Sequence, residues 1–223
     1  MDEARSSGVE SAAISIVGVG PGDPSLLTIR AVEVISRCSL ILHAGRRDRE
    51  GLAYEIVSGR IRPEQRVVGG ALAMMRGPDP GSVGYQRVAR VLVEEARVGR
   101  RAAFLTEGDP MLYGSGSYVA DQIEAIAPDL PVEIVPGVSA ISAAAARLGR
   151  PLARKHEVLT ICPATYHAAD IGAILDRHES TCLGHLENSL TKKRKGPCLG
   201  PFRGRLAMVI VEEHAGAMPA LFC

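Results

Sequence analysis

The feature that most constrains the fold is an apolar strand pattern that ends in glycines and is followed by a helix pattern and a second strand pattern. Residues 12–20, AAISIVGVG, predict a buried strand that enters a turn. Residues 25–38 then carry apolar residues at helical spacing, and Asp23 or Ser25 is expected to cap this helix. Residues 39–45, SLILHAG, predict a second strand. These three elements form a βαβ unit, which implies a parallel sheet with a right-handed crossover. The apolar positions of the helix are Leu26, Leu27, Ile29, Val32 and Ile35.

The alternation of strand and helix patterns continues beyond the loop-rich segment 69–86. An amphipathic helix is predicted at 85–99, where Gly99 ends it, and a strand at 100–110. Strands that alternate with helices define the α/β class. From Thr181 the pattern weakens, because the following residues are rich in Gly, Pro and positive charge. The other predicted elements are helices at 117–127 and 139–149 and strands at 131–137, 156–165 and 206–214.

Charge and composition exclude several classes of partner and location. The net charge of +1 and the pI of about 7.7 provide no field for nucleic acid or an anionic membrane. No apolar run reaches the roughly 18 residues of a membrane span, and the polar N-terminus is unlike a signal peptide. The five cysteines are far apart without a C-x-x-C pair, which favours a reducing compartment. We therefore expect a cytoplasmic protein that binds no nucleic acid and no membrane.

Three Gly/Pro/Asp turns follow apolar strands, at 18–24 (GVGPGDP), 107–116 (EGDPMLYGSG) and 135–140 (VPGVSA). Ligands of open α/β sheets bind outside the carboxyl ends of the strands, so the three turns together predict one wall of a pocket. Glycine allows a ligand to approach the backbone, and proline fixes the turn without adding a donor. Each turn alone is also explained as a strand–helix connection.

The turns do not suit a pyrophosphate. A phosphate site needs several converging N–H groups, often with a lysine, whereas the prolines of these turns have no N–H. Asp23 stands where a dinucleotide-binding turn would place its third glycine, and it would repel a phosphate, as would Asp109. The turns suit a neutral or cationic ligand that bonds to backbone and carboxylates, such as an adenosyl sulfonium.

These three motifs resemble the tetrapyrrole methylase family, the S-adenosylmethionine-dependent enzymes of corrin and sirohaem synthesis. The resemblance covers residues 14 to about 166, and residues 104–115 with 135–165 are most similar to the precorrin-2 C20-methyltransferases. It implies two α/β domains with the cofactor cleft between them, an N-terminal domain at 12–140 with a parallel sheet and a C-terminal domain at 141–223. It also implies a tetrapyrrole substrate and a homodimer.

The resemblance places the cofactor S-adenosylmethionine beside Pro21 of the first turn. It implies that Glu107, Gly108 and Asp109 contact the methionine or ribose portion and that Leu112 packs nearby. In the third turn, Ser139 and Ala140 are implied to bond to and pack against the cofactor. In relatives a strand of the second domain covers the adenine, and Leu183 is the candidate here.

The reaction that the resemblance implies transfers an activated methyl group to C20 of the tetrapyrrole, so positioning matters more than acid–base catalysis, and no general base is assigned. Glu107 or Asp109 is a candidate for stabilising the sulfonium, with anchoring of the turn as the alternative. Tyr113 stacks on the substrate or packs in the turn. The six histidines have no metal-ligand spacing, so we expect no metal site. Candidates for the substrate carboxylates are Arg46, Arg47 and Arg49, with a solvated loop as the alternative.

The chain departs from the family after about residue 181, where an expected apolar helix is missing and the C-terminus reads as truncated or atypical. This leaves three alternatives to a C20-methyltransferase. The first is another ring methylase, acting at C11, at C17 or on uroporphyrinogen. The second is a non-catalytic fragment that binds an adenosyl ligand. The third, a nucleotide-binding oxidoreductase, is disfavoured by Asp23.

Overall fold

A parallel sheet organises the first of two compact units into which contacts divide the chain, Met1–Ser139 and Ala140–Cys223. The computed structural model describes residues 13–45, 51–69, 80–163, 180–185, 206–211 and 220–222, with side chains up to residue 162 except for 80–82. Each unit is described by itself.

The sheet of the first unit has five strands in the order β3-β2-β4-β1-β5, and all four strand pairs are parallel. Strand β4 lies between β1 and β2, so the predicted βαβ unit crosses over one intervening strand. The strands are β1 (Ile14–Gly18), β2 (Leu40–His43), β3 (Arg66–Val68), β4 (Ala102–Thr106) and β5 (Val132–Val135).

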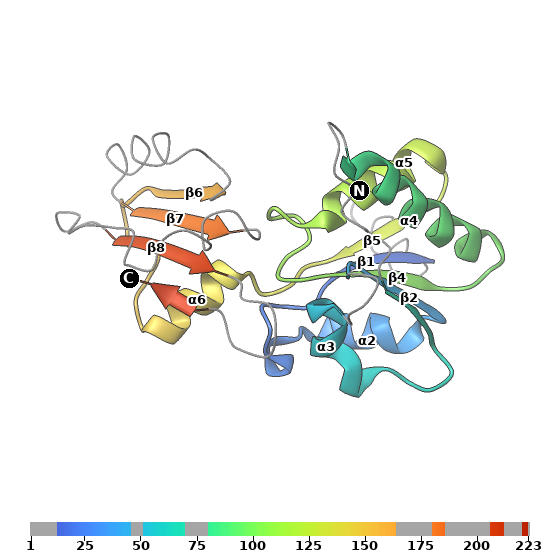
Figure 1. Ribbon diagram of the computed structural model, residues 1–223, viewed down its shortest axis with the longest axis horizontal. Coiled ribbons are helices and arrows are strands. Elements are labelled where there is room, and N and C mark those ends of the chain that lie inside the picture. The colour runs from blue at the N-terminus through green and yellow to red at the C-terminus, as the bar shows by residue number, and fades with distance from the viewer. Residues whose placement is uncertain are drawn as a thin grey trace, which may run out of the picture. The chain divides into compact units, whose positions relative to one another are not determined.

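Helices cover both faces of this sheet (Figure 1). Helices α2 (Ile29–Arg37) and α3 (Leu52–Val57) pack on one face, and α4 (Pro80–Arg97) and α5 (Ser115–Ile126) pack on the other. Alternate residues of one strand pack against the helices on opposite faces of the sheet. Val17 of β1 packs with α2 and α3, whereas Ile16 packs with α4 and α5. Every residue of β1 and β4 is therefore buried, which explains why these strands are apolar apart from Ser15 and Thr106.

The second unit contains helix α6 (Ala140–Leu148) and a separate four-stranded sheet in the order β6-β7-β8-β9. Its first three strands are parallel, and β9 pairs with β8 in the antiparallel direction. The strands are β6 (Leu159–Pro163), β7 (Ser180–His185), β8 (Leu206–Val211) and β9 (Ala220–Phe222).

Three local expectations are corrected, and two elements of the first unit were missed. The segment predicted as a loop to residue 86 is helical from Pro80, and α3 and β3 were not predicted. Asp23 caps only a short 3-10 turn at Pro24–Leu26, and Thr28 caps α2 by accepting a hydrogen bond from the Ala31 amide (3.1 Å). Ile29, predicted on the apolar face, is 80% exposed because it lies on the same face of α2 as the exposed residues Glu33 and Arg37, whereas Ala31, Val34 and Ile35 form the buried face.

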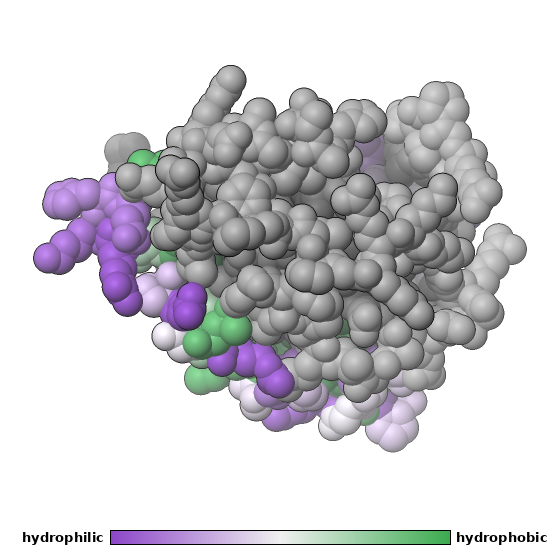
Figure 2. Space-filling model, turned by 60° about the vertical axis from the view of Figure 1, so that its left-hand side comes forward, coloured by the Kyte–Doolittle hydropathy of each residue, from purple (hydrophilic) through white to green (hydrophobic). Residues whose placement is uncertain are grey.

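On the face seen in Figure 2, the coloured residues are mostly hydrophilic, with small hydrophobic groups between them. Among the described residues, no helix has the length and hydropathy that a membrane crossing requires.

Candidate functional site

The order of the strands creates a switch point between β1 and β4. These strands are neighbours, but the chain leaves β1 for α2 on one face of the sheet and leaves β4 for α5 on the opposite face. In open α/β sheets the carboxyl ends of two such strands bound the crevice in which ligands bind. The first and second Gly/Pro/Asp turns begin at these two carboxyl ends, and the third follows the adjacent strand β5. The structure thus brings the three turns to one edge, as predicted.

Backbone hydrogen bonds join the first turn to the second. The Gly20 amide donates to the Gly108 carbonyl oxygen (3.2 Å), and the Gly108 amide donates to the Gly20 carbonyl oxygen (2.8 Å). One residue earlier, the Val19 amide donates to the Thr106 carbonyl oxygen (3.0 Å). Both bridging glycines have positive φ angles, +82° at Gly20 and +61° at Gly108, which larger residues rarely adopt. The two turns therefore form one connected backbone surface.

Asp109 joins the second turn to the third. Its Oδ1 accepts a hydrogen bond from the Met111 amide of its own turn (2.9 Å). Its Oδ2 accepts one from the Gly137 amide, 28 residues further along the chain (3.0 Å). The carboxylate thus has a turn-anchoring function, which was the alternative to its stabilising a sulfonium.

Gly137 lies where the three turns meet. The contacts among Gly20, Gly108, Asp109 and Gly137 form the turn junction. A Cβ atom at this position would overlap the Gly108 carbonyl oxygen and lie 2.9 Å from the Gly18 carbonyl carbon. Sequence reasoning expected the glycines to admit a ligand to the backbone, whereas here they allow the turns to approach one another. Gly137 was missed as a key residue, although the glycine that recurs in each turn was an available signal.

The predicted cofactor-contacting residues belong to the three turn segments 18–24, 107–116 and 135–140, and all are half-buried. Six of them belong to the first unit, whereas Ala140 is the first residue of α6 and of the second unit. They are Pro21, Glu107, Gly108, Asp109, Leu112, Ser139 and Ala140.

Other candidates lie outside the described part of the chain. Arg46, Arg47 and Arg49 are not among the described residues, and Leu183 lies on β7 without a described side chain.

The amides and the charge of the junction bear on the kind of ligand that it can hold. Four of its amides, those of Val19, Gly20, Gly108 and Gly137, already donate to protein acceptors. The hydrogen bonds from Ser25 hold the pKa of Asp23 below its ordinary value, so the first turn carries a negative charge at neutral pH. Engaged amides and a carboxylate do not make a cradle for a pyrophosphate.

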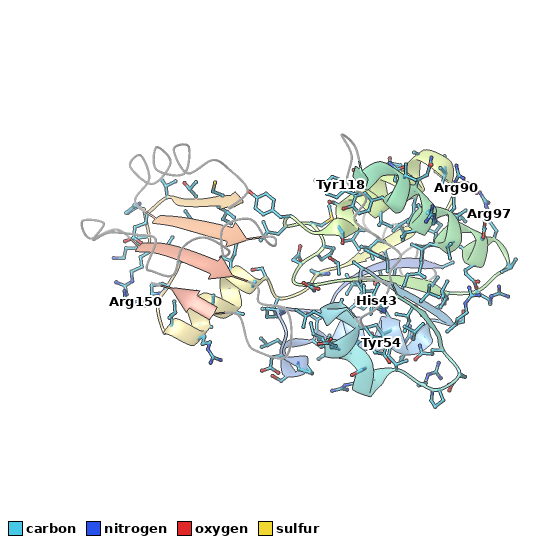
Figure 3. All side chains as sticks on the ribbon, viewed as in Figure 1. His43, Tyr54, Arg90, Arg97, Tyr118 and Arg150 are labelled. Carbon is cyan, nitrogen blue, oxygen red and sulfur yellow. The ribbon has the colours of Figure 1, made fainter. Side chains whose placement is uncertain are left out.

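His43 and Cys38 pack in the interior of the first unit. His43, at the end of β2, is 3% exposed, and its ring stacks on Tyr54 with centroids 5.3 Å apart (Figure 3). Burial raises the pKa of Cys38 to about 12, which keeps this thiol neutral. Among the described residues, no three His, Cys, Asp or Glu side chains are grouped to hold a metal ion.

A model of the family Tetrapyrrole (Corrin/Porphyrin) Methylases matches residues 13–194, which is most of the 223-residue chain. The chain belongs to the tetrapyrrole methylases. It is therefore a methyltransferase by family, and membership implies a tetrapyrrole substrate.

Among curated tetrapyrrole methylases, two relatives are C20-methyltransferases. The precorrin-2 C(20)-methyltransferase of Sinorhizobium sp is 29% identical over 96% of this chain and 90% of its own length. The cobalt-precorrin-2 C(20)-methyltransferase of Salmonella typhimurium is 30% identical over 75% of this chain and 70% of its own. Siroheme synthase 1 of Halorhodospira halophila is 36% identical over 69% of this chain, but the match spans only 29% of that longer protein.

Solved tetrapyrrole methylases have the same fold. A cobalt precorrin-4 methyltransferase superposes with a TM-score of 0.55 at 22% identity, over 69% of this chain and 58% of its own. The uroporphyrin-III-C-methyltransferase of Thermus thermophilus gives a TM-score of 0.50 at 25% identity, over 70% of this chain and 61% of its own. The predicted α/β fold of the family is confirmed.

Proposed function

We propose that this tetrapyrrole methylase is an S-adenosylmethionine-dependent methyltransferase that methylates C20 of precorrin-2 or of its cobalt-containing form, as a step in cobalamin biosynthesis. The observation that carries the choice of C20 is the extent of the match to the Sinorhizobium enzyme. That alignment runs over 96% of this chain and 90% of the relative, whereas the match to the siroheme synthase spans 29% of that protein.

Two features of the turn junction support S-adenosylmethionine as the methyl donor. The junction lies at the switch point of the sheet, where α/β folds bind their ligands. Its engaged amides and the carboxylate of Asp23 suit a ligand without a pyrophosphate. The proposed contacts are Pro21, Glu107, Gly108, Asp109, Leu112, Ser139 and Ala140, and Asp109 also holds the turns in place.

The contribution of the protein in this proposal is chiefly to position the reactants. When bound, S-adenosylmethionine supplies a methyl group already activated by its sulfonium. Holding two reactants in a reactive arrangement contributes roughly 7–11 kcal/mol to lowering a barrier. A rigid junction serves this purpose, because its two inter-turn links fix the backbone of all three turns. No general base is assigned.

A second candidate is another ring methylase, and the higher identity of the siroheme synthase match favours the uroporphyrinogen type. The proposal also includes two domains that meet near residue 140, a homodimer and a cytoplasmic location. The family resemblance supports the domains and the dimer, and the scattered cysteines support the location.

The first test is calorimetric titration of the purified chain with S-adenosylhomocysteine, in parallel with NAD as a ligand that carries a pyrophosphate. We expect micromolar binding of S-adenosylhomocysteine at one site per chain and no binding of NAD. The methylated carbon is then identified by NMR, with S-adenosylmethionine labelled by ¹³C in its methyl group and precorrin-2, its cobalt form or uroporphyrinogen III as acceptor.

Label at C20 of precorrin-2 or of its cobalt form would support the proposal and show which acceptor is used. Label only in uroporphyrinogen would establish the second candidate. A folded chain that binds S-adenosylhomocysteine without transferring its methyl group to any acceptor would be a binding protein. Binding of NAD alone would contradict the assignment of the turns.

A further inference from the structure

Ser15 is a buried polar residue in the otherwise apolar strand β1. It is 4% exposed, and because side chains alternate along a strand it lies on the same face as Val17, the face that α2 covers. Its hydroxyl group makes no hydrogen bond to any residue that the structure describes. The large majority of buried side-chain polar atoms have a hydrogen-bond partner, in the protein or in a bound molecule. The Ser15 hydroxyl group therefore points to a polar group that comes from outside the chain.

A small pocket adjoins Ser15 at the amino edge of the sheet. Ser15 is the second residue of β1, and Glu133, its partner in the register, is the second residue of β5. Both line the pocket, which is thus at the opposite edge from the turn junction. The enclosed part of the pocket has room for little more than one water-sized group, and the rest is open to solvent. It can take a compact ion but no organic ligand.

Positive charge predominates around this pocket. Arg30 and Arg37 of α2 and Arg101, directly before β4, line it together with one carboxylate, that of Glu133. The Arg30 Nε donates to Glu133 (2.6 Å), and Arg30 also binds Glu33 (3.2 Å), so both carboxylates are compensated. Arg37 forms no hydrogen bond or ion pair within the described part of the chain. The group as a whole retains an excess positive charge.

Two features that would repel an anion are neutralised. Burial raises the pKa of Cys38 to about 12, so the thiol that lines the pocket carries no charge and donates to the Val34 carbonyl oxygen (3.3 Å). The last carbonyl groups of a helix carry partial negative charge. At the end of α2, however, the side-chain amide of Gln65 donates to the carbonyl oxygens of Ile35 and Cys38 (2.7 Å each). The pocket therefore presents positive charge and hydrogen-bond donors.

We propose that this pocket binds a small inorganic oxyanion such as phosphate, held by the guanidinium groups of Arg37 and Arg101 and by the hydroxyl group of Ser15. Guanidinium groups match the geometry of oxyanions, and a serine hydroxyl group supplies a further donor. One oxygen of the anion fills the enclosed part of the pocket, and the others lie at its open mouth. The bound anion joins α2 to strands β1 and β4 and stabilises the first unit. The inference is independent of the proposed function.

The test measures urea unfolding of the full chain at pH 7 in sodium phosphate, against sodium chloride of the same ionic strength, which accounts for general screening. The Kd of phosphate is determined by calorimetry. An anion that binds only the folded chain lowers the equilibrium constant of unfolding, and phosphate at ten times its Kd should lower it about 10-fold. The affinity for S-adenosylhomocysteine should be the same with and without phosphate.

Two variants and one control locate the anion. Arg37→Gln removes a guanidinium group, and Ser15→Ala removes a hydroxyl group, that have no partner among the described residues, so neither should lose stability in chloride. Each should weaken phosphate binding about 10-fold, as the loss of one hydrogen bond to a charged group predicts. Arg90→Gln removes the same charge as Arg37→Gln from an exposed position on α4, on the opposite face of the sheet (Figure 3). It should keep the native phosphate affinity.

Weakened phosphate binding in both pocket variants and not in Arg90→Gln would support the inference. An equal loss in Arg37→Gln and Arg90→Gln would mean that phosphate is attracted by overall charge, and the inference would be overturned. Phosphate that stabilises the native chain no more than chloride does would overturn it as well, and the pocket would then hold water alone. Competition between phosphate and S-adenosylhomocysteine would place the anion at the turn junction and also overturn it.

Discussion

At the scale of single residues, Asp109 shows how one carboxylate can hold two turns together. Each of its two oxygens accepts one backbone N–H, from Met111 in its own turn and from Gly137 in the third turn. Asp109→Ala removes both acceptors. We expect the free energy of unfolding to fall by about 1–3 kcal/mol, the usual effect of leaving buried or half-buried donors without a partner. Calorimetry should show the affinity for S-adenosylhomocysteine falling by about 10-fold or more, because a loosened third turn no longer presents its residues.

The matched control is Asp129→Ala. Asp129 lies between α5 and β5, before the amino end of β5, and its carboxylate binds Arg97 of α4. This variant should bind S-adenosylhomocysteine like the native chain. Equal affinities in the two variants would mean that the link between Asp109 and Gly137 has no part in the site.

The sequence was sufficient to find the three turns but not to reveal how their residues contact one another. The three turns could be found from Gly, Pro and Asp after apolar runs, and the structure brings them to one edge. The contact between Gly137 and Gly108 could not be found, because it depends on β1 lying between β4 and β5. Strand order is a property of the whole sheet, and no local pattern in the sequence encodes it. The positive φ angle of Tyr113, +55°, could not be found either, because tyrosine has no preference for such a conformation.

At the scale of elements, Glu95 links helix α4 to the edge strand β3. Its carboxylate binds Arg66 of β3 (2.7 Å) and Arg100 beyond the helix (2.5 Å), and its side chain is 10% exposed. The hydrogen bond from Arg100 is the main cause that holds the pKa of Glu95 below its ordinary value. A carboxyl with a depressed pKa stabilises the fold above its unfolded pKa, about 4.3 for Glu, and this contribution is lost as the pH falls through the folded value.

We therefore expect Glu95→Gln to lower the free energy of unfolding by about 1–2 kcal/mol at neutral pH, a modest value because both arginines are exposed. The difference from the native chain should shrink as the pH falls below about 4.3, the ordinary value for Glu, because the native carboxylate takes up its proton as the pH passes through its lowered pKa. Urea unfolding of both proteins at a series of pH values from neutral to acid measures this difference in the free energy of unfolding. Glu94→Gln, at the exposed neighbouring position, is the control and should change stability little. The difference in stability could instead stay the same at acid pH. That result would show that the charge of Glu95 does not cause the destabilisation.

The elements that sequence reasoning found and missed differ in burial. Strands β1, β2, β4 and β5 were predicted from their apolar residues, which the helices on the sheet faces bury. Strand β3 is a three-residue edge strand with Arg66 and Val68 exposed, so it carries no apolar run. Helix α3 has only six residues between Gly51 and Ser58, which is too short for a helical period to emerge. Tertiary pairing and packing, more than local preference, determine these two elements.

At the scale of the whole molecule, the position of a strand in the sheet determines how its amides respond to a ligand. Strands β1 and β4 have a hydrogen-bonded neighbour on each side and are buried on both faces, so their amides exchange with solvent only when the first unit unfolds. Strand β3 lies at an open edge, and its amides exchange through local opening. A ligand that binds only the folded unit slows exchange through unfolding of the unit, as in β1 and β4, and leaves exchange through local opening of β3 unaffected.

S-adenosylhomocysteine at about 100 times its Kd should therefore slow exchange in β1 and β4 by about 100-fold and change β3 little. Hydrogen exchange followed by mass spectrometry resolves the strands and the three turns in one experiment. The amides of Gly20, Gly108 and Gly137 already donate within the protein, so they should be protected even before the ligand is added. Unprotected turn amides that become protected only with ligand would instead make the junction a cradle completed by its ligand. Bound ligand without any slowing in β1 and β4 would place the binding site outside the first unit and away from the switch point of its sheet.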